Sequence, residues 1–244
     1  LCERGLGQTK VTLLEQLGGD PERCVVGRAE EFSVGESIDP FSVIAIEVTA
    51  GDAPEVYSLS PGLPDQAFKH DGQLTKRIVR AATLSALAPF PGEMLWDVGA
   101  GCGSISIEWM RAARGTHAIA VESDAKRREL IDFNAQRLGV PQLRIEAGRA
   151  PETLTNLPAP QAIFIGGGAS DPAIFERCWD AMMGGGRLVV NAVTLEGEQQ
   201  LNMRHNELGG ELNRISVESP SAQGRFRMMQ PARTVTQLAL VKQR

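Results

Sequence analysis

The amino-acid sequence predicts an α/β protein built on a doubly wound, mostly parallel β-sheet, and two observations support this prediction. From residue 94 onward, short apolar runs alternate with longer amphipathic segments, which is the element order of βαβ units. The first of these runs, residues 94–98, leads directly into the stretch Gly99-Ala100-Gly101-Cys102-Gly103. Glycine lacks a Cβ atom, so a strand that ends in such a loop can turn sharply into the helix that follows.

The expected elements follow one another in chain order. The first helix comes after a polar turn at residues 71–77, and its apolar side is expected to hold Ile78, Val79, Ala82, Leu84 and Leu87. Prolines 89 and 91 end it. Strands are expected at residues 94–98, 117–121, 143–146, 162–165, 187–193, 212–217 and 234–241. Further helices are expected at residues 104–113, 125–138, 171–182 and 195–208.

The first 50 residues are expected to be the end of another domain, because they hold too few elements to enclose a core of their own. The chain also begins at Leu1 rather than Met, as a piece of a longer protein would. We expect a short helix at residues 11–17 and strands at residues 24–27 and 43–48. Residues 51–63 are rich in Pro and Gly and are predicted to be a linker. The main domain is then residues 64–244.

Composition and charge argue against several classes of protein. With 42% hydrophobic and 23% charged residues, the chain is expected to be soluble and globular. No apolar run approaches the ~20 residues of a transmembrane helix, and no signal peptide is visible at the start. The net charge of −5 argues against a nucleic-acid partner, because phosphate binding favours a basic face.

Cysteine and histidine usage predicts neither a disulfide framework nor a metal site. The 4 cysteines form no C-x-x-C pair, and the 3 histidines are scattered along the chain. Free thiols fit a reducing compartment, so a cytoplasmic location is expected.

Glycines and an acid follow several of the expected strands, so they would meet at one edge of the sheet. Ligands of doubly wound sheets bind beyond the carboxyl ends of the strands, at the switch point. Glu122 ends the second strand, and its two oxygens can accept hydrogen bonds from the vicinal hydroxyls of a ribose. Ala150 follows the third strand and Gly166-Gly167-Gly168 the fourth. An ordinary turn and a solvated acid remain the alternatives for each feature alone, whereas their convergence favours a binding site.

The glycine spacing separates two kinds of nucleotide site. The stretch reads G-x-G-x-G with Asp97 shortly before it, whereas the dinucleotide fingerprint is G-x-G-x-x-G. The observed spacing resembles motif I of the class I (Rossmann-like) methyltransferases, which bind S-adenosylmethionine (SAM). This resemblance implies a seven-stranded, mostly parallel sheet with SAM at the glycine loop.

Four stretches carry a closer resemblance. They are residues 70–76 (His-Asp-Gly-Gln-Leu-Thr-Lys), residues 95–109 around the glycine loop, the triple glycine at 166–168, and residues 224–226 (Gly-Arg-Phe). Together they resemble the precorrin-6Y C(5,15)-methyltransferases (decarboxylating), a family of cobalamin biosynthesis. The resemblance covers about residues 60–244 and matches the family's C-terminal methyltransferase half. Residues 1–50 are similar to the end of its N-terminal tetrapyrrole methylase half, whose remainder is an implied partner.

The resemblance implies an activity and a set of SAM contacts. The activity is SAM-dependent methylation of precorrin-6Y at carbon 15 with decarboxylation of the ring C acetate, in a homo-oligomer expected to be a tetramer. The implied SAM contacts are Thr75, Gly99, Ala100, Gly101, Cys102, Gly103, Glu122 and Ala150. Arg149 stands where many class I methyltransferases carry an acid that reaches the adenine, so that contact is expected from the backbone near Ala150.

A substrate that carries many carboxylates would need basic partners. The planar guanidinium of arginine matches carboxylate geometry. Arg225, Arg227 and Arg233 cluster in the loop expected between the last two strands. We therefore hypothesise that Arg225 and Arg227 bind acids of the substrate; three solvent-exposed arginines are the alternative. Gly166, Gly167, Gly168 and Asn191 are expected to line the same pocket.

No general acid is predicted for the decarboxylation. Methyl transfer mainly requires that donor and acceptor are aligned and water is excluded, so no nucleophilic side chain is needed. Cys102 is interpreted as a small packing residue. Glu108 and Asp97 are candidate acids only by location, and Asp97 is expected to anchor the loop.

Three other functions remain open at this point. A class I methyltransferase could act on another substrate, such as tRNA, which a substrate screen would reveal. A nicotinamide oxidoreductase is disfavoured by the glycine spacing and would bind NAD in a titration. A SAM-binding module without activity would bind SAM and show no turnover.

Overall fold

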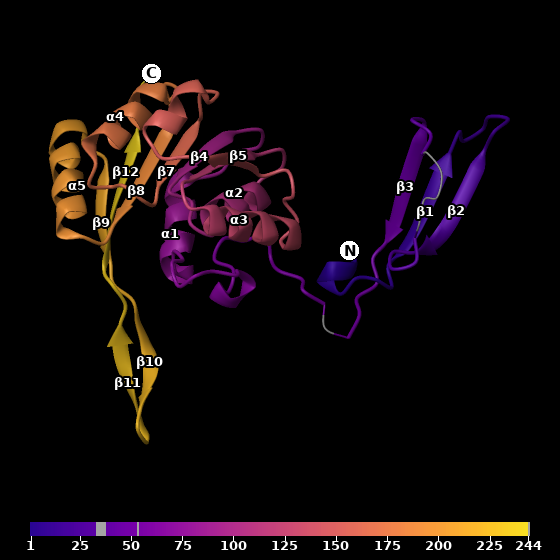
Figure 1. The fold of residues 1–244 in the computed structure, drawn as a ribbon, viewed down its shortest axis with the longest axis horizontal. Helices are drawn as coiled ribbons and strands as arrows, with labels where there is room; N and C mark the ends of the chain where they lie inside the picture. The colour runs from indigo at the N-terminus through magenta and orange to yellow at the C-terminus, as the bar shows by residue number, and fades with distance from the viewer. Residues whose placement is uncertain (33–37, 53, 244) are drawn as a thin grey trace. The chain divides into compact units, whose positions relative to one another are not determined.

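A computed structural model describes residues 1–32, 38–52 and 54–243 (Figure 1). The chain divides into two compact units, Leu1–Tyr57 and Ser58–Arg244. The division falls inside the linker predicted at residues 51–63. Residues 33–37, 53 and 244, which belong to the predicted segments 1–50, 51–63 and 64–244, lie outside the described residues.

The first unit is a three-stranded antiparallel sheet in the order β2-β1-β3. β1 spans Lys10–Glu15, β2 spans Arg23–Arg28 and β3 spans Ser42–Glu47. The helix predicted at residues 11–17 is therefore wrong, because this segment is the central strand. Val11 and Leu13 are buried and alternate with less buried residues, and both edges of β1 are paired. Sheet pairing thus outweighs the local apolar spacing that suggested a helix.

The first unit leaves apolar side chains uncovered. Val26, Val43, Ile44 and Ile46 are each more than half exposed, and no residue of β3 is buried. Soluble proteins usually cover or charge an outer strand, because its unpaired backbone and apolar side chains favour association. This sheet therefore presents an apolar surface to its surroundings.

The second unit contains a seven-stranded sheet in the order β6-β5-β4-β7-β8-β12-β9. Its strands are β4 (Met94–Val98), β5 (His117–Glu122), β6 (Arg144–Ala147), β7 (Ala162–Ile165), β8 (Arg187–Ala192), β9 (Glu211–Ile215) and β12 (Val235–Val241). The strands from β6 to β8 in this order are parallel, and β12 is antiparallel to both of its neighbours. The predicted doubly wound, mostly parallel sheet is confirmed, and its switch point lies between β4 and β7.

Helices cover both faces of this sheet. They are α1 (Arg77–Leu87), α2 (Ser104–Ala112), α3 (Ala125–Arg137), α4 (Pro172–Ala181) and α5 (Leu195–Leu208). Trp96 of β4 packs in one core cluster with Cys178 of α4 and Leu201 of α5. The next residue along β4, Asp97, instead hydrogen-bonds α2, so α2 covers the opposite face. On α1, Ile78 is 55% exposed, so the prediction that it lies on the apolar side is wrong.

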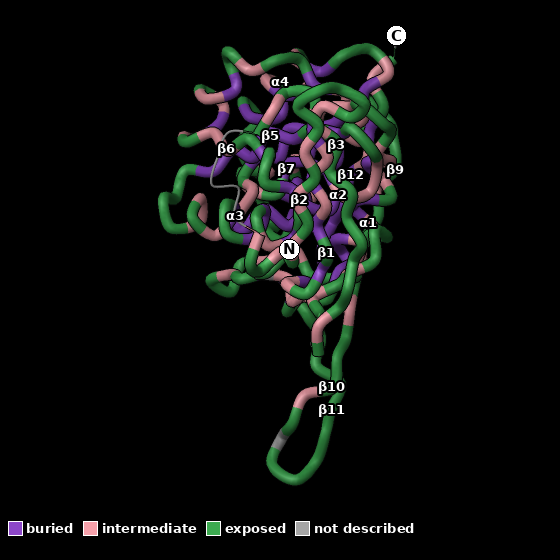
Figure 2. Tube along the Cα trace, turned by 90° about the vertical axis from the view of Figure 1, so that its right-hand side faces the viewer, coloured by how far each residue is buried: buried purple, intermediate pink, exposed green. Residues whose placement is uncertain are grey.

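A two-stranded hairpin interrupts the return from β9 to β12, where only a loop was expected. β10 spans Glu218–Gln223 and β11 spans Phe226–Pro231. The hairpin projects away from the sheet (Figure 1), and its tube is coloured almost entirely as exposed (Figure 2). The apolar side chains of Phe226, Met228 and Met229 are each more than half exposed.

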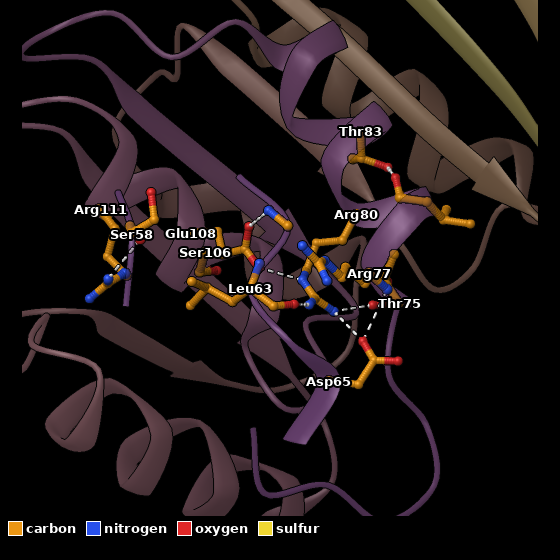
Figure 3. A network of polar contacts seen from close by, with 12 residues as sticks. Ser58, Leu63, Asp65, Thr75, Arg77, Arg80, Thr83, Ser106, Glu108 and Arg111 are labelled. Atoms are coloured by element: carbon orange, nitrogen blue, oxygen red, sulfur yellow. Dashed lines mark hydrogen bonds and ion pairs between the residues drawn. The ribbon is translucent and has the colours of Figure 1, made fainter. Parts of the chain in front are cut away.

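A buried ion pair anchors the segment that precedes α1 (Figure 3). Arg80 of α1 is fully buried, and its Nε donates to Oε1 of Glu108 in α2 at 2.5 Å. Its Nη2 donates to the carbonyl oxygen of Leu63. Its Nη1 donates to the carbonyl oxygen of Thr75 and to Oδ1 of Asp65. The segment before α1 forms no strand and only one short 3-10 helix, so these contacts fix its path.

Replacing Arg80 should destabilise the second unit strongly. Arg80→Met leaves the buried Glu108 carboxylate without its cation, and breaking a buried pair costs about 3–5 kcal/mol. Arg214→Met is the matched control, because exposed Arg214 pairs with Glu198 at the surface and should contribute no more than about 1 kcal/mol. Chemical denaturation measures both, and equal losses would contradict the anchoring role.

Candidate functional site

The glycine loop closes the carboxyl edge of β4. Gly99, Gly101 and Gly103 have φ values of +72°, +62° and +79°, a region that side-chain-bearing residues rarely adopt. The N–H groups of Gly99 and Ala100 donate to the carbonyl oxygen of Val121 at 3.0 and 3.2 Å, which ties the loop to the end of β5. The loop then enters α2 directly, as the sequence predicted.

The triple glycine after β7 packs against the glycine loop. The N–H groups of Gly166 and Gly167 donate to the carbonyl oxygen of Val98 at 2.9 and 3.2 Å. A Cβ atom on Gly99 would lie 2.8 Å from the backbone of Gly167. Two backbones therefore approach closely across the switch point, and only glycine at position 99 permits it.

The other two glycines of the loop face different surroundings. A Cβ atom on Gly103 would lie 2.9 Å from Cγ2 of Ile131, so α3 packs against the end of the loop. A Cβ atom on Gly101 would meet only the carbonyl oxygen of Gln73, at 3.9 Å. The backbone at Gly101 is thus open to a ligand, with the segment that carries Thr75 beside it.

Glu122 lies against this open part of the loop. Its carboxyl group is buried, and Oε2 accepts the N–H of Gly101 at 2.9 Å while Oε1 accepts the N–H of Asp124 at 3.0 Å. Each carboxylate oxygen can accept a further hydrogen bond. The structure therefore brings together the predicted acid and the predicted glycine loop.

Asp97 is buried beneath the loop with one oxygen unpaired. Its Oδ2 accepts the N–H and the hydroxyl of Ser106, at 3.1 and 2.6 Å, whereas Oδ1 has no hydrogen-bond partner among the described residues. Burial raises the pKa of this carboxyl to about 6, although the hydrogen bonds from Ser106 act to lower it. The bonds to Ser106 agree with the predicted anchoring role, and the unpaired oxygen marks a place for a donor.

The surroundings of Cys102 and Glu108 indicate that both residues stabilise the fold rather than react. Burial raises the pKa of the Cys102 thiol to about 11, which supports its interpretation as a packing residue. Glu108 pairs with Arg80, and its two oxygens accept the backbone N–H groups of Gly62 and Leu63. Glu108 therefore fixes the segment before α1. All of its contacts among the described residues are structural, which corrects the suggestion that it is a candidate general acid.

Thr75 and Ala150 border the same edge from two sides. The carbonyl oxygen of Thr75 accepts a hydrogen bond from Arg80, immediately before α1 begins. Ala150 is buried after β6, and Gly148 in the same turn donates its N–H to the carbonyl oxygen of Glu122 at 3.3 Å. Arg149 is exposed, so the departure from the acidic residue of many class I methyltransferases lies at the surface.

Asn191 takes part in a polar cluster that the sequence did not predict. Its amide Nδ2 donates to Oγ1 of Thr83 in α1 at 3.0 Å, and its Oδ1 accepts from Gln237 of β12 at 2.9 Å. Gln237 also donates to Thr83 at 3.1 Å. These three residues are far apart in the sequence, so only the fold reveals that they fix the orientation of Asn191.

The predicted arginines lie on the hairpin rather than in a loop. Arg225 precedes β11 and stacks on Phe226 at 4.9 Å, and Arg227 lies within β11; both are exposed. The hairpin leaves the sheet where β9 ends and β12 begins, which is the edge that carries the glycine loop. It then projects away, so the structure does not bring these arginines to the glycine loop (Figure 1).

Two other kinds of site find no support in the described residues. Within the described ranges, no three His, Cys, Asp or Glu side chains gather in a way that could hold a metal ion. No helix in the described part of the chain is both long enough and apolar enough to cross a membrane.

Comparisons with known proteins place this geometry among methyltransferases. A family model described as a precorrin methyltransferase domain matches residues 66–242. A relative from Sinorhizobium sp. named "Precorrin-6Y C(5,15)-methyltransferase [decarboxylating]" is 46% identical over 242 residues, which are 99% of this chain and 58% of that protein. The chain thus spans well under two thirds of the length of this relative.

Two further relatives resemble mainly one part of the chain. A Pyrobaculum calidifontis protein named "Probable cobalt-precorrin-6B C(15)-methyltransferase (decarboxylating)" is 35% identical over 177 residues, which are 70% of this chain and 90% of that protein. The crystal structure of the C-terminal domain of precorrin-6Y C5,15-methyltransferase from Rhodobacter capsulatus superposes with a TM-score of 0.71 at 45% identity. The superposition covers 75% of this chain and 98% of that domain.

A side chain at position 99 should disrupt the switch point. Gly99→Ala combines a left-handed backbone with a Cβ atom 2.8 Å from the Gly167 backbone, which cannot yield as a side chain would. Gly92→Ala is the matched control, because Gly92 has φ +81° but no atom within 4 Å of the place that a Cβ atom would take. Thermal unfolding should show a loss of about 1 kcal/mol for the control and clearly more for Gly99→Ala; similar losses would argue against the close approach.

Neutralising Asp97 should stabilise the fold at high pH. The carboxyl has a pKa of ~3.9 in an unfolded chain and about 6 in the fold. The folded state therefore binds this proton more tightly, and stability falls as the pH rises from about 4 to about 6. Asp97→Asn should be more stable than the parent chain by about 1–3 kcal/mol at pH 8, and the gain should vanish below pH ~4. Denaturation at both pH values measures this, and a pH-independent difference would contradict the burial argument.

Proposed function

Because the chain belongs to the precorrin methyltransferase domain family, we propose that it transfers a methyl group from SAM to carbon 15 of precorrin-6Y and decarboxylates the ring C acetate, as a step of cobalamin biosynthesis. The observation that carries this proposal is the pairing of two acids with the glycine loop at the switch point. There Asp97 keeps an unpaired oxygen, and Glu122 lies beside the open backbone of Gly101.

The residues at this edge fit SAM. Glu122 offers acceptors for the two ribose hydroxyls, and the unpaired Oδ1 of Asp97 suits a donor such as the ammonium of the amino-acid part. The open backbone at Gly101 allows close approach of the ligand. The proposed SAM-binding residues are Thr75, Gly99, Ala100, Gly101, Cys102, Gly103, Glu122 and Ala150.

The chain's own task in this reaction is alignment. Bound SAM supplies an electrophilic methyl group on its sulfonium, and the nucleophilic carbon belongs to the macrocycle. The loops after β4 and β7 hold the donor and the acceptor in line and exclude water, which is where the rate gain arises. Burial raises the pKa of the Cys102 thiol to about 11, which disfavours the thiolate that a covalent mechanism would need.

The assignment to carbon 15 rests on how much of each relative's length this chain matches. The Pyrobaculum protein, whose printed name specifies carbon 15 and decarboxylation, is matched over 90% of its length. The Sinorhizobium protein, named for carbons 5 and 15, is matched over 58%. We infer that the second unit of this chain carries the carbon-15 chemistry.

The residues proposed to bind the substrate are chosen by their chemistry and by their position near the carboxyl edge of the sheet. Gly166, Gly167 and Gly168 are proposed to line the pocket with their backbone, since they pack closely against Phe164, Gly99 and Ile174. Asn191 presents an amide that Thr83 and Gln237 orient. Arg225 and Arg227 are proposed to bind carboxylates of the macrocycle, since guanidinium groups match them. Their exposure supports this proposal because the hairpin leaves them free of ion pairs among the described residues.

The first unit is proposed to be the end of an N-terminal tetrapyrrole methylase domain, in residues 1–50, joined by the linker 51–63 to the methyltransferase domain 64–244. The apolar surface of its sheet supports this proposal, because Val43, Ile44 and Ile46 on β3 need a cover. The occupant we propose is the remainder of that domain.

The proposal extends to assembly and location. Phe226, Met228 and Met229 on the hairpin offer an apolar surface for a homotetramer. The cysteines Cys2, Cys24, Cys102 and Cys178 are free thiols, which supports a reducing cytoplasm. The net charge of −5 supports a small-molecule substrate over nucleic acid. We propose no metal and no membrane partner.

Turnover by the chain tests the proposed function. Incubation with SAM and precorrin-6Y should add one methyl group by mass and release carbon dioxide, and the Arg225→Ala/Arg227→Ala variant should raise KM for the tetrapyrrole about tenfold with unchanged KM for SAM. Arg114→Ala is the control, because Arg114 is exposed and lies in the turn that follows α2. Methylation of tRNA instead, or SAM binding without turnover, would overturn the proposal.

A further inference from the structure

The segment between residues 68 and 76 needs an external support. It carries Thr75 and approaches the glycine loop, since the carbonyl oxygen of Gln73 lies 3.9 Å from the Cβ position of Gly101. It contains no helix or strand of its own. Any ligand held between this segment and the loop would depend on the spacing between them.

Asn134 of α3 bridges the segment and the loop. Its Oδ1 accepts the N–H of Lys69 at 2.9 Å, and its Nδ2 donates to the carbonyl oxygen of Lys69 at 2.9 Å. The same Nδ2 donates to the carbonyl oxygen of Cys102 at 3.0 Å. Both amide hydrogens are therefore used, one on each side of the gap.

Packing alone does not explain an amide at this place in α3. Asn134 is fully buried on the inner side of α3, together with Ile131 and Ala135. Asparagine is a poor residue for a helix interior, and an apolar side chain of similar size would fill the same space. The polar side chain is therefore explained by the two backbones that it joins.

The other supports of the segment act elsewhere. Arg127 pairs with Asp71 at 2.8 Å on the surface, where ion pairs contribute little. Arg80, which lies in α1, donates a hydrogen bond to the carbonyl oxygen of Thr75. Neither contact reaches the glycine loop, whereas Asn134 does.

We propose that Asn134 is a positioning residue for SAM, which sets the distance between the segment carrying Thr75 and the glycine loop without touching the ligand. This inference rests on the proposed function. It adds a determinant of cofactor affinity that lies outside the eight proposed contacts.

A nearly isosteric variant separates positioning from packing. Asn134→Leu should weaken binding of S-adenosylhomocysteine about tenfold in calorimetry, because three hydrogen bonds to two backbones are lost. In turnover it should raise KM for SAM by a similar factor, with kcat and the tetrapyrrole KM within about twofold. Thr116→Val is the matched control: the hydroxyl of buried Thr116 donates to the carbonyl oxygens of Trp109 and Ala113 at the opposite edge of the sheet, its partners among the described residues.

The outcomes distinguish this inference from the proposed function. If the parent chain does not bind S-adenosylhomocysteine, the proposed function fails. If the parent binds and Asn134→Leu binds equally well while its Tm falls, Asn134 is only structural and the inference is overturned.

If Asn134→Leu does not fold, a measurement on the unaltered chain still tests the inference. Hydrogen exchange of the Lys69 amide should slow when S-adenosylhomocysteine binds, because this N–H donates to Asn134. Unchanged exchange at Lys69 upon binding would contradict the inference.

Discussion

The second unit depends on the close approach of two backbones across its switch point. Gly99 after β4 and Gly167 after β7 come so near that a Cβ atom on Gly99 would lie 2.8 Å from the Gly167 backbone. The carbonyl oxygen of Val98 accepts the N–H groups of both Gly166 and Gly167. This contact fixes the rim on which Glu122 and Gly101 lie. Because parallel strands end at one edge, a single constraint organises residues from three strands.

Two buried carboxylates, Glu108 in α2 and Asp97 bonded to it through Ser106, differ in how fully their oxygens are hydrogen-bonded. Glu108 is satisfied by Arg80 and two backbone N–H groups, so it holds the chain in place. Asp97 is satisfied on one oxygen only, and its raised pKa records the cost of burial without a cation. Asp97 thus keeps one unsatisfied oxygen at the place where a donor is proposed to bind, and proteins commonly give up stability where they bind ligands.

Much of the fold could be predicted because its signals are local. The run from β4 into the glycine loop and the alternating elements that follow need no distant partner to be recognised, and the predicted strand at 94–98 agrees with Met94–Val98. β1 was missed because its pairing with β2 and β3 outweighs local spacing. The hairpin was missed because every residue of β11 is exposed and, among the β10 residues whose burial is described, none is buried. Asn134 was missed because its partner Lys69 lies 65 residues away; no spacing rule links the two.

The central claim is that a sulfonium nucleoside occupies the rim formed by the ends of β4, β5 and β7. A crystal structure of the chain with S-adenosylhomocysteine tests it most directly. The account predicts the ribose hydroxyls at the Glu122 carboxylate and the amino-acid part over the glycine loop towards Asp97. A nucleoside bound elsewhere on the chain, with the rim empty or filled by side chains, would contradict it.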